Sequence, residues 1–496
     1  AVEEKYVSKD FLLDYADYYS LCFQAFDKFC VRLHFFRLKE GLQPAKEFVE
    51  GQITAGADNL DGRFWSSNYL GCAVIKPIPD SIFGPTVLRN YDYERPNPKR
   101  EYWGTRTYTI HFFGLPIKVE MSLAFQEQDR NVAACATIAI WCVLQRAAED
   151  YYINLRSPSQ ITKEAGTVGP NSSRLLPNSG LDVYAIAKIV SKLGMAPEYR
   201  SILDMDHVLD LNGFVKAFVR AYSRLKQPIL LLLQIGDDYH AVAITGYTID
   251  HASAGVLKAG MESKLLRIMA KENLVYQYSR LYSGRIGKLY VHDDGWGPFC
   301  RVIFDGYTKL SMTWNEERNV EVRAVGLMAP VFPKIRVAFE DIYVKTVFIE
   351  KWFKSVARFL YAPSIAQVIT RASSLDIQLM ESQEIKQIVC NEEVFSNEGS
   401  DRDVQLKFAL ISLPKSIWVL TWRIAEEVAF RAIFDTTALR GGKEFIECLF
   451  YSSRLQNDIL KVLTLQAKDP KLKYEVEQGF NLSIEELIYI FGKIKV

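Results

Sequence analysis

The sequence lacks any apolar run long enough to cross a lipid bilayer as a helix, which takes about 20 residues. Its first residues also lack the basic segment and apolar core that mark a secretory signal. We therefore expect a protein without membrane contact and with a cytoplasmic location.

The sequence has no excess of either charge. Its 60 Lys and Arg residues nearly balance 59 Asp and Glu residues, which leaves a formal net charge of +1. Proteins that bind nucleic acid through the phosphate backbone carry a basic excess or a basic stripe. We therefore expect no nucleic-acid partner.

Cysteine is scarce and scattered, with eight residues in 496 and no CxxC pair or Cys/His knuckle. A disulfide framework needs a dense cysteine pattern, and a structural zinc site needs paired ligands at short spacing. The pattern therefore favours reduced thiols, and we expect neither a metal nor a cofactor.

The most informative stretch covers residues 125–144. Its first part is polar and includes Gln126 and Gln128, whereas residues 132–144 are almost wholly apolar and contain no Gly or Pro. Such a run predicts a helix that is buried on all sides. Cys135 lies near its start, where the helix dipole favours a reactive thiolate. The alternative interpretation is that Cys135 is an ordinary buried core residue.

Two later stretches supply groups that could act with this thiol. Residues 228–247 read as a buried hairpin, and His240 opens its second strand. Residues 288–299 read as another strand that ends in a carboxylate pair, Asp293 and Asp294, and a Gly-rich turn. The order along the chain is therefore Cys, His and then Asp.

This order and setting resemble the papain-like cysteine peptidases over residues 120–330. The closest resemblance is to the bacterial branch that includes the double-glycine leader peptidases. In that branch the Cys follows a Gln-containing loop and the His begins a His-Ala-Val strand that ends in Gly-Tyr, as residues 240–247 do here. Asp294-Gly-Trp-Gly297 is similar to the Asn-Ser-Trp-Gly sequence of papain.

The resemblance implies a role for each residue. Cys135 is the expected nucleophile, His240 the base, and an Asp the group that orients the imidazole. Asp293 and Asp294 both qualify, and because neighbouring residues of a strand point to opposite faces, we expect only one to face the site. We favour Asp293. Gln128 is the first choice for the oxyanion donor, and Gln126 is the second.

Two features depart from the family pattern. Ala136 follows the cysteine where the family usually has Gly, and Gln128 lies seven residues before Cys135 where six is usual. These departures favour an alternative, a catalytically weak scaffold that binds a protein partner. A second alternative is another acyl-transfer enzyme of the same fold, such as a deamidase, transglutaminase or deconjugase. A third is a metal site formed by carboxylates and histidines, with these candidate ligands: Asp237, Asp238, His240, His292, Asp293 and Asp294.

The expected fold class is α+β, with a papain-like core in which a central buried helix packs on an antiparallel sheet. We expect three domains: residues 1–119 with a helix and a small sheet, residues 120–333 with the peptidase core, and residues 334–496 as an α+β domain. The first hypothesis for the whole chain is a peptidase that cleaves a peptide or isopeptide bond. Its expected partners are a protein or peptide substrate and a protein docked on the C-terminal domain.

Several segments outside the core carry their own patterns. The spacing of apolar residues predicts a helix over 8–35 and a strand over 375–389, and it predicts a helix over 444–467. Residues 257–278 read as a charged helical insertion.

Overall fold

The structure is a computed structural model. It describes residues 1–37, 50–51, 53–54, 68–90, 99–129, 131–166, 180–203, 205, 210–250, 281–363, 366, 373–391, 401–424, 427–439 and 442–494. The insertion expected at 257–278 lies outside these ranges. Helices and antiparallel sheets occur throughout the described chain, which confirms the α+β class. Within those ranges, no helix combines the length and apolarity that a membrane crossing requires.

The chain forms two compact units. The first comprises residues 1–204, 226–249 and 287–330, and the second comprises residues 205–225, 250–286 and 331–496. The second unit thus includes two segments that fall inside the expected peptidase domain. The expected boundaries after residues 119 and 333 stay predictions.

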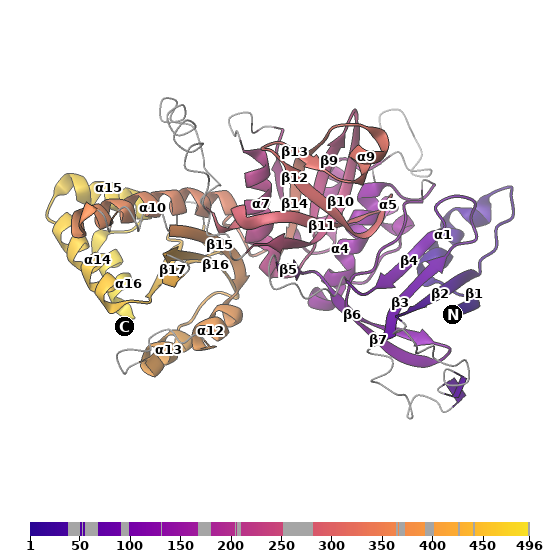
Figure 1. Cartoon of the computed structure of the whole chain (residues 1–496), viewed down its shortest axis with the longest axis horizontal. Coiled ribbons are helices and arrows are strands. Elements are labelled where there is room, and N and C mark those ends of the chain that lie inside the picture. Colours follow the sequence, from indigo (N-terminus) through magenta and orange to yellow (C-terminus); the bar gives the residue numbers. More distant parts are fainter. Residues whose placement is uncertain are drawn as a thin grey trace. The chain divides into compact units, whose positions relative to one another are not determined.

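The first unit is built around one buried helix, α4 (Cys135–Tyr151). It contacts β10 (Asp238–Ile249) and β9 (Ile229–Ile235), and Figure 1 shows it beside these strands. Eleven of its seventeen residues are buried, so the prediction of a helix enclosed on all sides is confirmed along most of its length.

The strands near α4 form a ring. Their order is β11 (Ile286–Asp293), β12 (Gly297–Asp305), β13 (Lys309–Ser311), β14 (Val322–Val331), β9 and β10, and β11 also pairs with β10. The predicted hairpin of residues 228–247 is confirmed as β9 and β10, which pair from Ile229 with Ile244 to Ile235 with Asp238. Ring closure brings the start of β10 and the end of β11 together, and these ends carry His240 and Asp293.

The N-terminal part of this unit adds a sheet and a hairpin. The sheet has the order β1 (Val2–Tyr6), β2 (Cys30–Phe36), β3 (Tyr69–Ile75) and β4 (Phe83–Leu88). The hairpin pairs β6 (Arg106–Phe112) with β7 (Leu115–Ser122). The helix predicted over 8–35 is wrong in extent, because α1 covers only Lys9–Asp17 and β2 follows after a short 3₁₀ turn.

The described part of the first unit contains further elements. They are β5 (Lys99–Tyr102), α5 (Pro158–Ala165), α6 (Val183–Lys192), β8 (Ala196–Ser201) and α9 (Thr313–Arg318). Helix α5 contacts both α1 and α4, so it connects the N-terminal helix with the central one.

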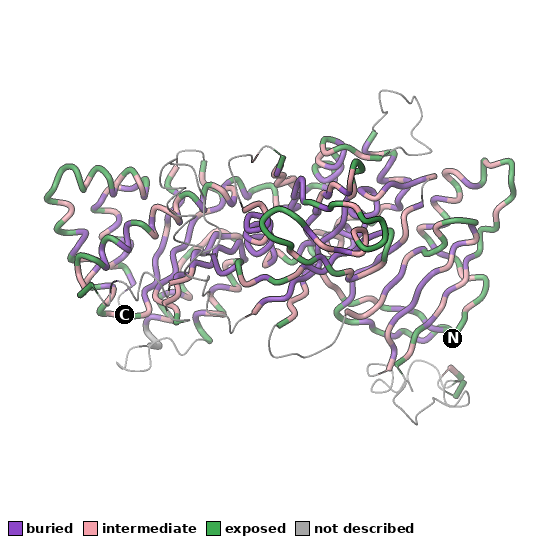
Figure 2. Tube along the Cα trace, turned by 45° about the horizontal axis from the view of Figure 1, so that its top comes forward, coloured by how far each residue is buried: buried purple, intermediate pink, exposed green. Residues whose placement is uncertain are grey.

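The second unit is centred on an antiparallel sheet. Its order is β15 (Ser373–Glu381), β16 (Ser416–Ile424), β17 (Glu427–Asp435) and β18 (Phe445–Phe450). Its helices are α7 (Leu211–Tyr222), α10 (Phe339–Leu360), α12 (Ser382–Asn391), α13 (Asp401–Leu410), α14 (Ser453–Gln466), α15 (Pro470–Phe480) and α16 (Ile484–Lys493). In Figure 2 the trace of its C-terminal helices alternates between buried and exposed residues, as expected for helices that cover a core on one side.

Two predictions in this unit are wrong in extent. The strand predicted over 375–389 ends at Glu381 and continues as α12. The helix predicted over 444–467 begins as strand β18, and helix α14 starts only at Ser453.

Candidate active site

Cys135 is the first residue of α4, as the sequence predicts. The backbone N–H of Ala134, which precedes the helix, donates to the hydroxyl of Thr137 at 3.4 Å. The first amides of a helix have no partner within it and form the positive end of its dipole. Cys135 is only partly buried, whereas Cys142, two turns later, is fully buried. The thiol that stands at the helix start is therefore also the more accessible one.

The loop before Cys135 is fixed at both ends. Phe125 exchanges two backbone hydrogen bonds with Thr86 of β4, at 2.6 and 2.8 Å. Nearer the helix, the backbone oxygen of Asp129 accepts from the amides of Val132 and Ala133, and its carboxylate accepts from the hydroxyl of Tyr19 at 2.6 Å. The segment that holds Gln126 and Gln128 thus runs along the edge of the N-terminal sheet.

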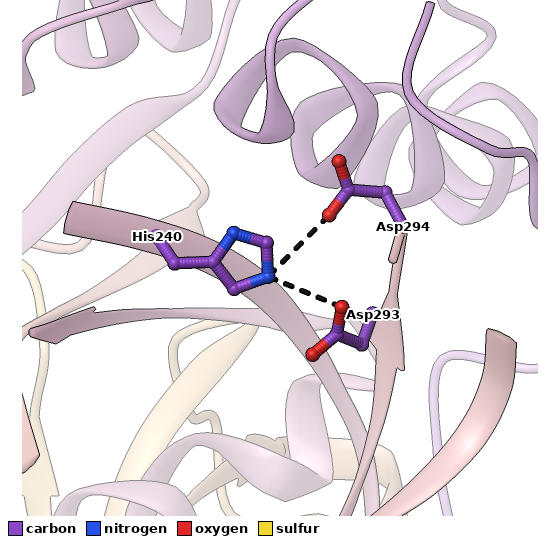
Figure 3. A group of neighbouring side chains, drawn as sticks. All are labelled: His240, Asp293 and Asp294. Carbon is purple, nitrogen blue, oxygen red and sulfur yellow. Dashed lines mark hydrogen bonds and ion pairs between the residues drawn. The ribbon is translucent and has the colours of Figure 1, made fainter. Parts of the chain in front are cut away.

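His240 contacts two carboxylates and also interacts with the Cys135 thiol. Its Nε2 is 3.2 Å from Oδ1 of Asp293 and 3.4 Å from Oδ1 of Asp294. Dashed lines mark both contacts in Figure 3. Burial lowers the pKa of His240, but the hydrogen bond to Asp293, the contact with the Cys135 thiol and the charges of both aspartates together raise this pKa well above its usual value. An imidazole that holds its proton at neutral pH beside a thiol favours the thiolate.

Asp293 is completely buried, and both of its carboxylate oxygens are hydrogen bonded. Besides His240, its Oδ1 accepts from the backbone N–H of Gly295 at 3.0 Å. Its Oδ2 accepts from the indole N–H of Trp314 at 2.8 Å. Three donors therefore hold this carboxylate in one orientation toward the imidazole.

Asp294 is also buried, with 4% of its surface exposed, but its environment is different. Neither of its carboxylate oxygens has a hydrogen-bond partner among the described residues. Burial raises the pKa of Asp294 from 3.8 to about 7; the charge of His240 opposes this rise and that of Asp293 adds to it. Asp294 is thus a carboxyl group that faces His240 without the donors that stabilise Asp293.

The expectation that only one of the two aspartates faces the site is wrong. Strand β11 ends at Asp293, and its pairing with β12 shifts register between Val291 and Asp293. The backbone N–H of Trp296 donates to the oxygen of Asp293 at 3.0 Å, which turns the chain there. Asp294 lies in that turn, so the alternation of a regular strand no longer governs its direction.

Trp314 is a site residue that the sequence does not indicate. It comes from α9, and its ring packs edge-on against His240 with the ring centroids 5.3 Å apart. Trp296 packs edge-on against Trp314 in turn, at 5.4 Å. A Cβ at Gly295 would approach the Trp314 ring to 2.8 Å, so a side chain at this position would displace the indole. No local motif marks Trp314, because only the path of the strand ring brings it to Asp293.

The two candidate oxyanion donors differ in burial. The side chain of Gln126 is buried, and its amide nitrogen has no hydrogen-bond partner among the described residues. Gln128 is half-buried. A buried amide N–H that lacks a partner is costly in a folded protein. Gln126 therefore has the feature expected of a donor that awaits a substrate oxygen.

Of the six candidate metal ligands, the structure brings three together. Ligand atoms of His240, Asp293 and Asp294 lie within 4.8 Å of one another. Asp237 and Asp238 are exposed on the hairpin between β9 and β10.

His292 is no metal ligand, because both of its ring nitrogens are already used. Its Nδ1 accepts from the N–H of Phe299 at 3.3 Å, and its Nε2 donates to the oxygen of Leu123 at 3.1 Å. Burial lowers the pKa of His292 to about 4, which keeps the ring neutral. His292 connects β11 with the loop that leads to Cys135.

Comparisons with known proteins give no match: no protein-family model, no curated protein and no solved structure corresponds to this chain. A functional assignment therefore depends on the geometry and chemistry of the site itself.

Proposed function

We propose that this protein is a cysteine peptidase in which Cys135, His240 and Asp293 form a catalytic triad. The observation that carries the proposal is the position of the His240 ring. The ring interacts with the Cys135 thiol, and its Nε2 is hydrogen bonded to the buried Asp293 carboxylate at 3.2 Å. A nucleophile beside a base that a third group orients is the arrangement that nucleophilic catalysis needs.

The architecture supports the same proposal. A helix that begins at the cysteine packs on the antiparallel strands β9 and β10, of which β10 supplies the histidine. The aspartate comes from β11, which pairs with β10. This arrangement fits the papain-like core that the sequence resembles.

The proposed reaction begins with attack of the Cys135 thiolate on the carbonyl carbon of a peptide or isopeptide bond. The tetrahedral intermediate collapses, the C–N bond breaks, and the imidazolium of His240 gives its proton to the leaving amine. A thioester remains on Cys135. His240 then takes a proton from water, the resulting hydroxide attacks the thioester, and the acid product and the thiolate are released.

The oxyanion of the intermediate needs donors that are already in place. The backbone N–H of Cys135, at the start of α4, is one candidate, because the first amides of a helix have no partner within it. A side-chain amide is the second. We favour Gln126 over Gln128 for this role because its amide nitrogen is buried and has no hydrogen-bond partner among the described residues.

A catalytically weak scaffold is the second candidate function. Ala136 in place of Gly puts a methyl group directly after the nucleophile, and neither glutamine has the usual spacing from Cys135. In this case the site would hold a protein or peptide without cleaving it, and the C-terminal region would dock a protein partner. The thiol chemistry of Cys135 distinguishes the two candidates.

The test is alkylation of the intact chain with iodoacetamide over a range of pH, read for each cysteine by mass spectrometry. The exposed Cys390 serves as an internal reference for an ordinary thiol. We expect Cys135 to react at a pH at least one unit lower than Cys390, and His240→Ala to abolish this difference. Coincident profiles for the two thiols in the unmodified protein would leave only the scaffold.

A matched pair of substitutions tests the nucleophile directly. Cys135→Ala should abolish peptide cleavage with little change in the melting temperature, because the thiol is partly exposed and Ala fits a helix. Cys142→Ala should spare cleavage and lower the free energy of unfolding by about 1–2 kcal/mol, because it truncates a fully buried side chain. Full turnover by Cys135→Ala would end the proposal.

A further inference from the structure

The Nε2 atom of His240 lies in a group of three possible metal ligands. This nitrogen and one oxygen each of Asp293 and Asp294 converge from β10, the end of β11 and the following turn, as Figure 3 shows. The catalytic proposal gives a role to Asp293 alone. It leaves unexplained why a second carboxylate is buried against the same nitrogen.

Asp294 carries the observation that points to a ligand. The residue is 96% buried, and neither carboxylate oxygen has a hydrogen-bond partner among the described residues; its contact with His240 is an ion pair at 3.4 Å. Burying a carboxylate without donors is expensive, and such groups are found where they are paired or where they coordinate a metal. A metal ion bound between Asp294 and Nε2 of His240 would give this buried carboxylate a coordination partner.

The distances suit a transition-metal ion. Zn²⁺ lies about 2.0–2.2 Å from nitrogen and carboxylate ligands and prefers a tetrahedral arrangement, in which neighbouring ligand atoms are about 3.3–3.5 Å apart. The separations of Nε2 from the two carboxylate oxygens are 3.2 and 3.4 Å. These two separations suit such an ion, all three ligand atoms lie within 4.8 Å of one another, and water would complete the site.

The surroundings of Asp293 support this arrangement as outer hydrogen bonds do in known metal sites. Trp314 donates to Oδ2 and leaves Oδ1 directed at His240. The ligand set also favours a transition metal, since Ca²⁺ takes six to eight oxygen ligands and Mg²⁺ prefers oxygen and retains water.

We propose that His240, Asp293 and Asp294 form a binding site for Zn²⁺ or a similar divalent transition-metal ion, and that the bound ion reversibly inhibits the protein. The inhibitory part rests on the proposed function, whereas binding does not. Coordination requires the Nε2 lone pair, so the proton on Nε2 is released to solvent. The neutral ring then carries its one remaining proton on Nδ1 and cannot accept a proton from Cys135.

The experiment titrates the full-length chain, treated first with a chelator, with Zn²⁺ and separately with Mg²⁺ by calorimetry. Four variants are compared after their fold has been checked by circular dichroism: Asp294→Asn, Asp293→Asn, His240→Ala and Cys135→Ala. We expect one Zn²⁺ per chain, at least about tenfold weaker binding for each variant that loses a ligand, and less than about threefold change for Cys135→Ala.

Two results would overturn the proposal. One is the absence of a Zn²⁺ site that depends on His240 and Asp294. The other is loss of binding in Cys135→Ala with Asp294→Asn unaffected, which would place the ion on the thiol. If His240→Ala fails to fold, the near-isosteric Asp294→Asn still shows whether the ion binds through the aspartates or through the Cys135 thiol.

Alkylation of Cys135 separates this proposal from the catalytic one. Zn²⁺ should slow the alkylation of Cys135 in the unmodified protein, a chelator should restore it, and Asp294→Asn should remove the effect. If Cys135 reacts only as an ordinary thiol but Zn²⁺ still binds through His240 and Asp294, the catalytic proposal fails and the metal site stands. If Cys135 is strongly activated but Zn²⁺ does not bind, the metal site fails and the catalytic proposal stands.

Discussion

The indole N–H of Trp314 donates a 2.8 Å hydrogen bond to Oδ2 of Asp293, the carboxylate whose other oxygen faces His240. A hydrogen bond to a charged group is worth about 1.5–3 kcal/mol, so Trp314 is expected to fix the carboxylate and thereby the imidazole. In the proposed mechanism it is a positioning residue, because it acts on the thiol only through Asp293 and His240.

The first prediction follows from this bond. Trp314→Phe keeps an aromatic ring against His240 but removes the donor. We expect the alkylation rate of Cys135 near pH 6.5 to fall by about tenfold, since the loss corresponds to roughly 1.4 kcal/mol or more. Trp296→Phe is the matched control, because the Trp296 ring packs against Trp314, and its hydrogen bond to Asp293 is made by the backbone N–H, which Phe keeps. Equal effects of the two substitutions would mean that only ring packing matters.

The second prediction separates the two aspartates. In protein kept free of metal ions, Asp293→Ala should lower the reactivity of Cys135 strongly, because His240 loses its hydrogen-bonded counter-charge. Asp293→Asn should retain part of it, since an amide oxygen can still accept from Nε2. Asp294→Asn should reduce reactivity less than either change. Kinetics of alkylation for the three variants provide the measurement, and a larger loss in Asp294→Asn would make Asp294 the orienting group.

The third prediction distinguishes Gln126 from Gln128. An oxyanion donor stabilises a tetrahedral intermediate but is not needed for alkylation, and its loss costs about 10²–10³ in turnover. Gln126→Ala should therefore lower the hydrolysis of an activated aryl ester by such a factor while leaving the alkylation of Cys135 nearly unchanged. Gln128→Ala should have a smaller effect on both. The reversed order would restore Gln128 as the donor that the sequence alone favours.

The parts of the fold that the sequence predicts well are those with strong local patterns. The apolar run after Cys135 and the hairpin that carries His240 are long, bounded by turn residues and unambiguous in period. The order of Cys, His and Asp then follows from where these elements begin and end. Chemistry that lies at the ends of regular elements can be located from sequence.

The failures have identifiable physical causes. Apolar residues between 375 and 389 continue from a strand into helix α12, and a short apolar run does not reveal its period. The helix start at Ser453 is marked by Ser452, whose hydroxyl accepts from the N–H of Leu455 at 3.3 Å, and this cap gives a local signal that the prediction over 444–467 overlooks.

In the site, the departures arise from tertiary structure. Asp294 turns toward His240 because the strand ends and the chain bends, which residue alternation does not describe. Trp314 reaches Asp293 from 21 residues further along the chain, by way of the strand ring. No pattern within one element contains either contact.

The last prediction concerns Asp14, which anchors α5 beside the helix that carries Cys135. The Asp14 carboxylate accepts from the N–H of Ser159 at 3.1 Å. Burial raises the pKa of Asp14 from 3.8 to about 7, although the hydrogen bonds from Ser159 and Ser157 oppose the rise. The charge of Asp10 adds to this rise, whereas the buried ammonium of Lys76 is attracted to the ionised carboxylate. Between about pH 4 and 7 the folded protein therefore keeps a proton that the unfolded chain has lost.

Because the folded state binds more protons over this interval, the contribution of Asp14 to stability decreases as the pH rises from 4 to 7 and is constant above that range. Asp14→Asn removes this dependence and retains an oxygen that can accept from Ser159. The difference in free energy of unfolding between the variant and the unmodified protein should shift in favour of the variant by about 2–3 kcal/mol as the pH rises from 5 to 8. Urea denaturation at each pH measures this difference.

Asp17→Asn is the matched control. Asp17 lies on the same helix and accepts from the Ser159 hydroxyl. Partial burial raises the pKa of Asp17, but its bonds to Lys163 and Ser159 outweigh this effect and lower the pKa. Its difference from the unmodified protein should stay flat over this range, and parallel pH curves for Asp14→Asn and the unmodified protein would show that Asp14 is ionised throughout.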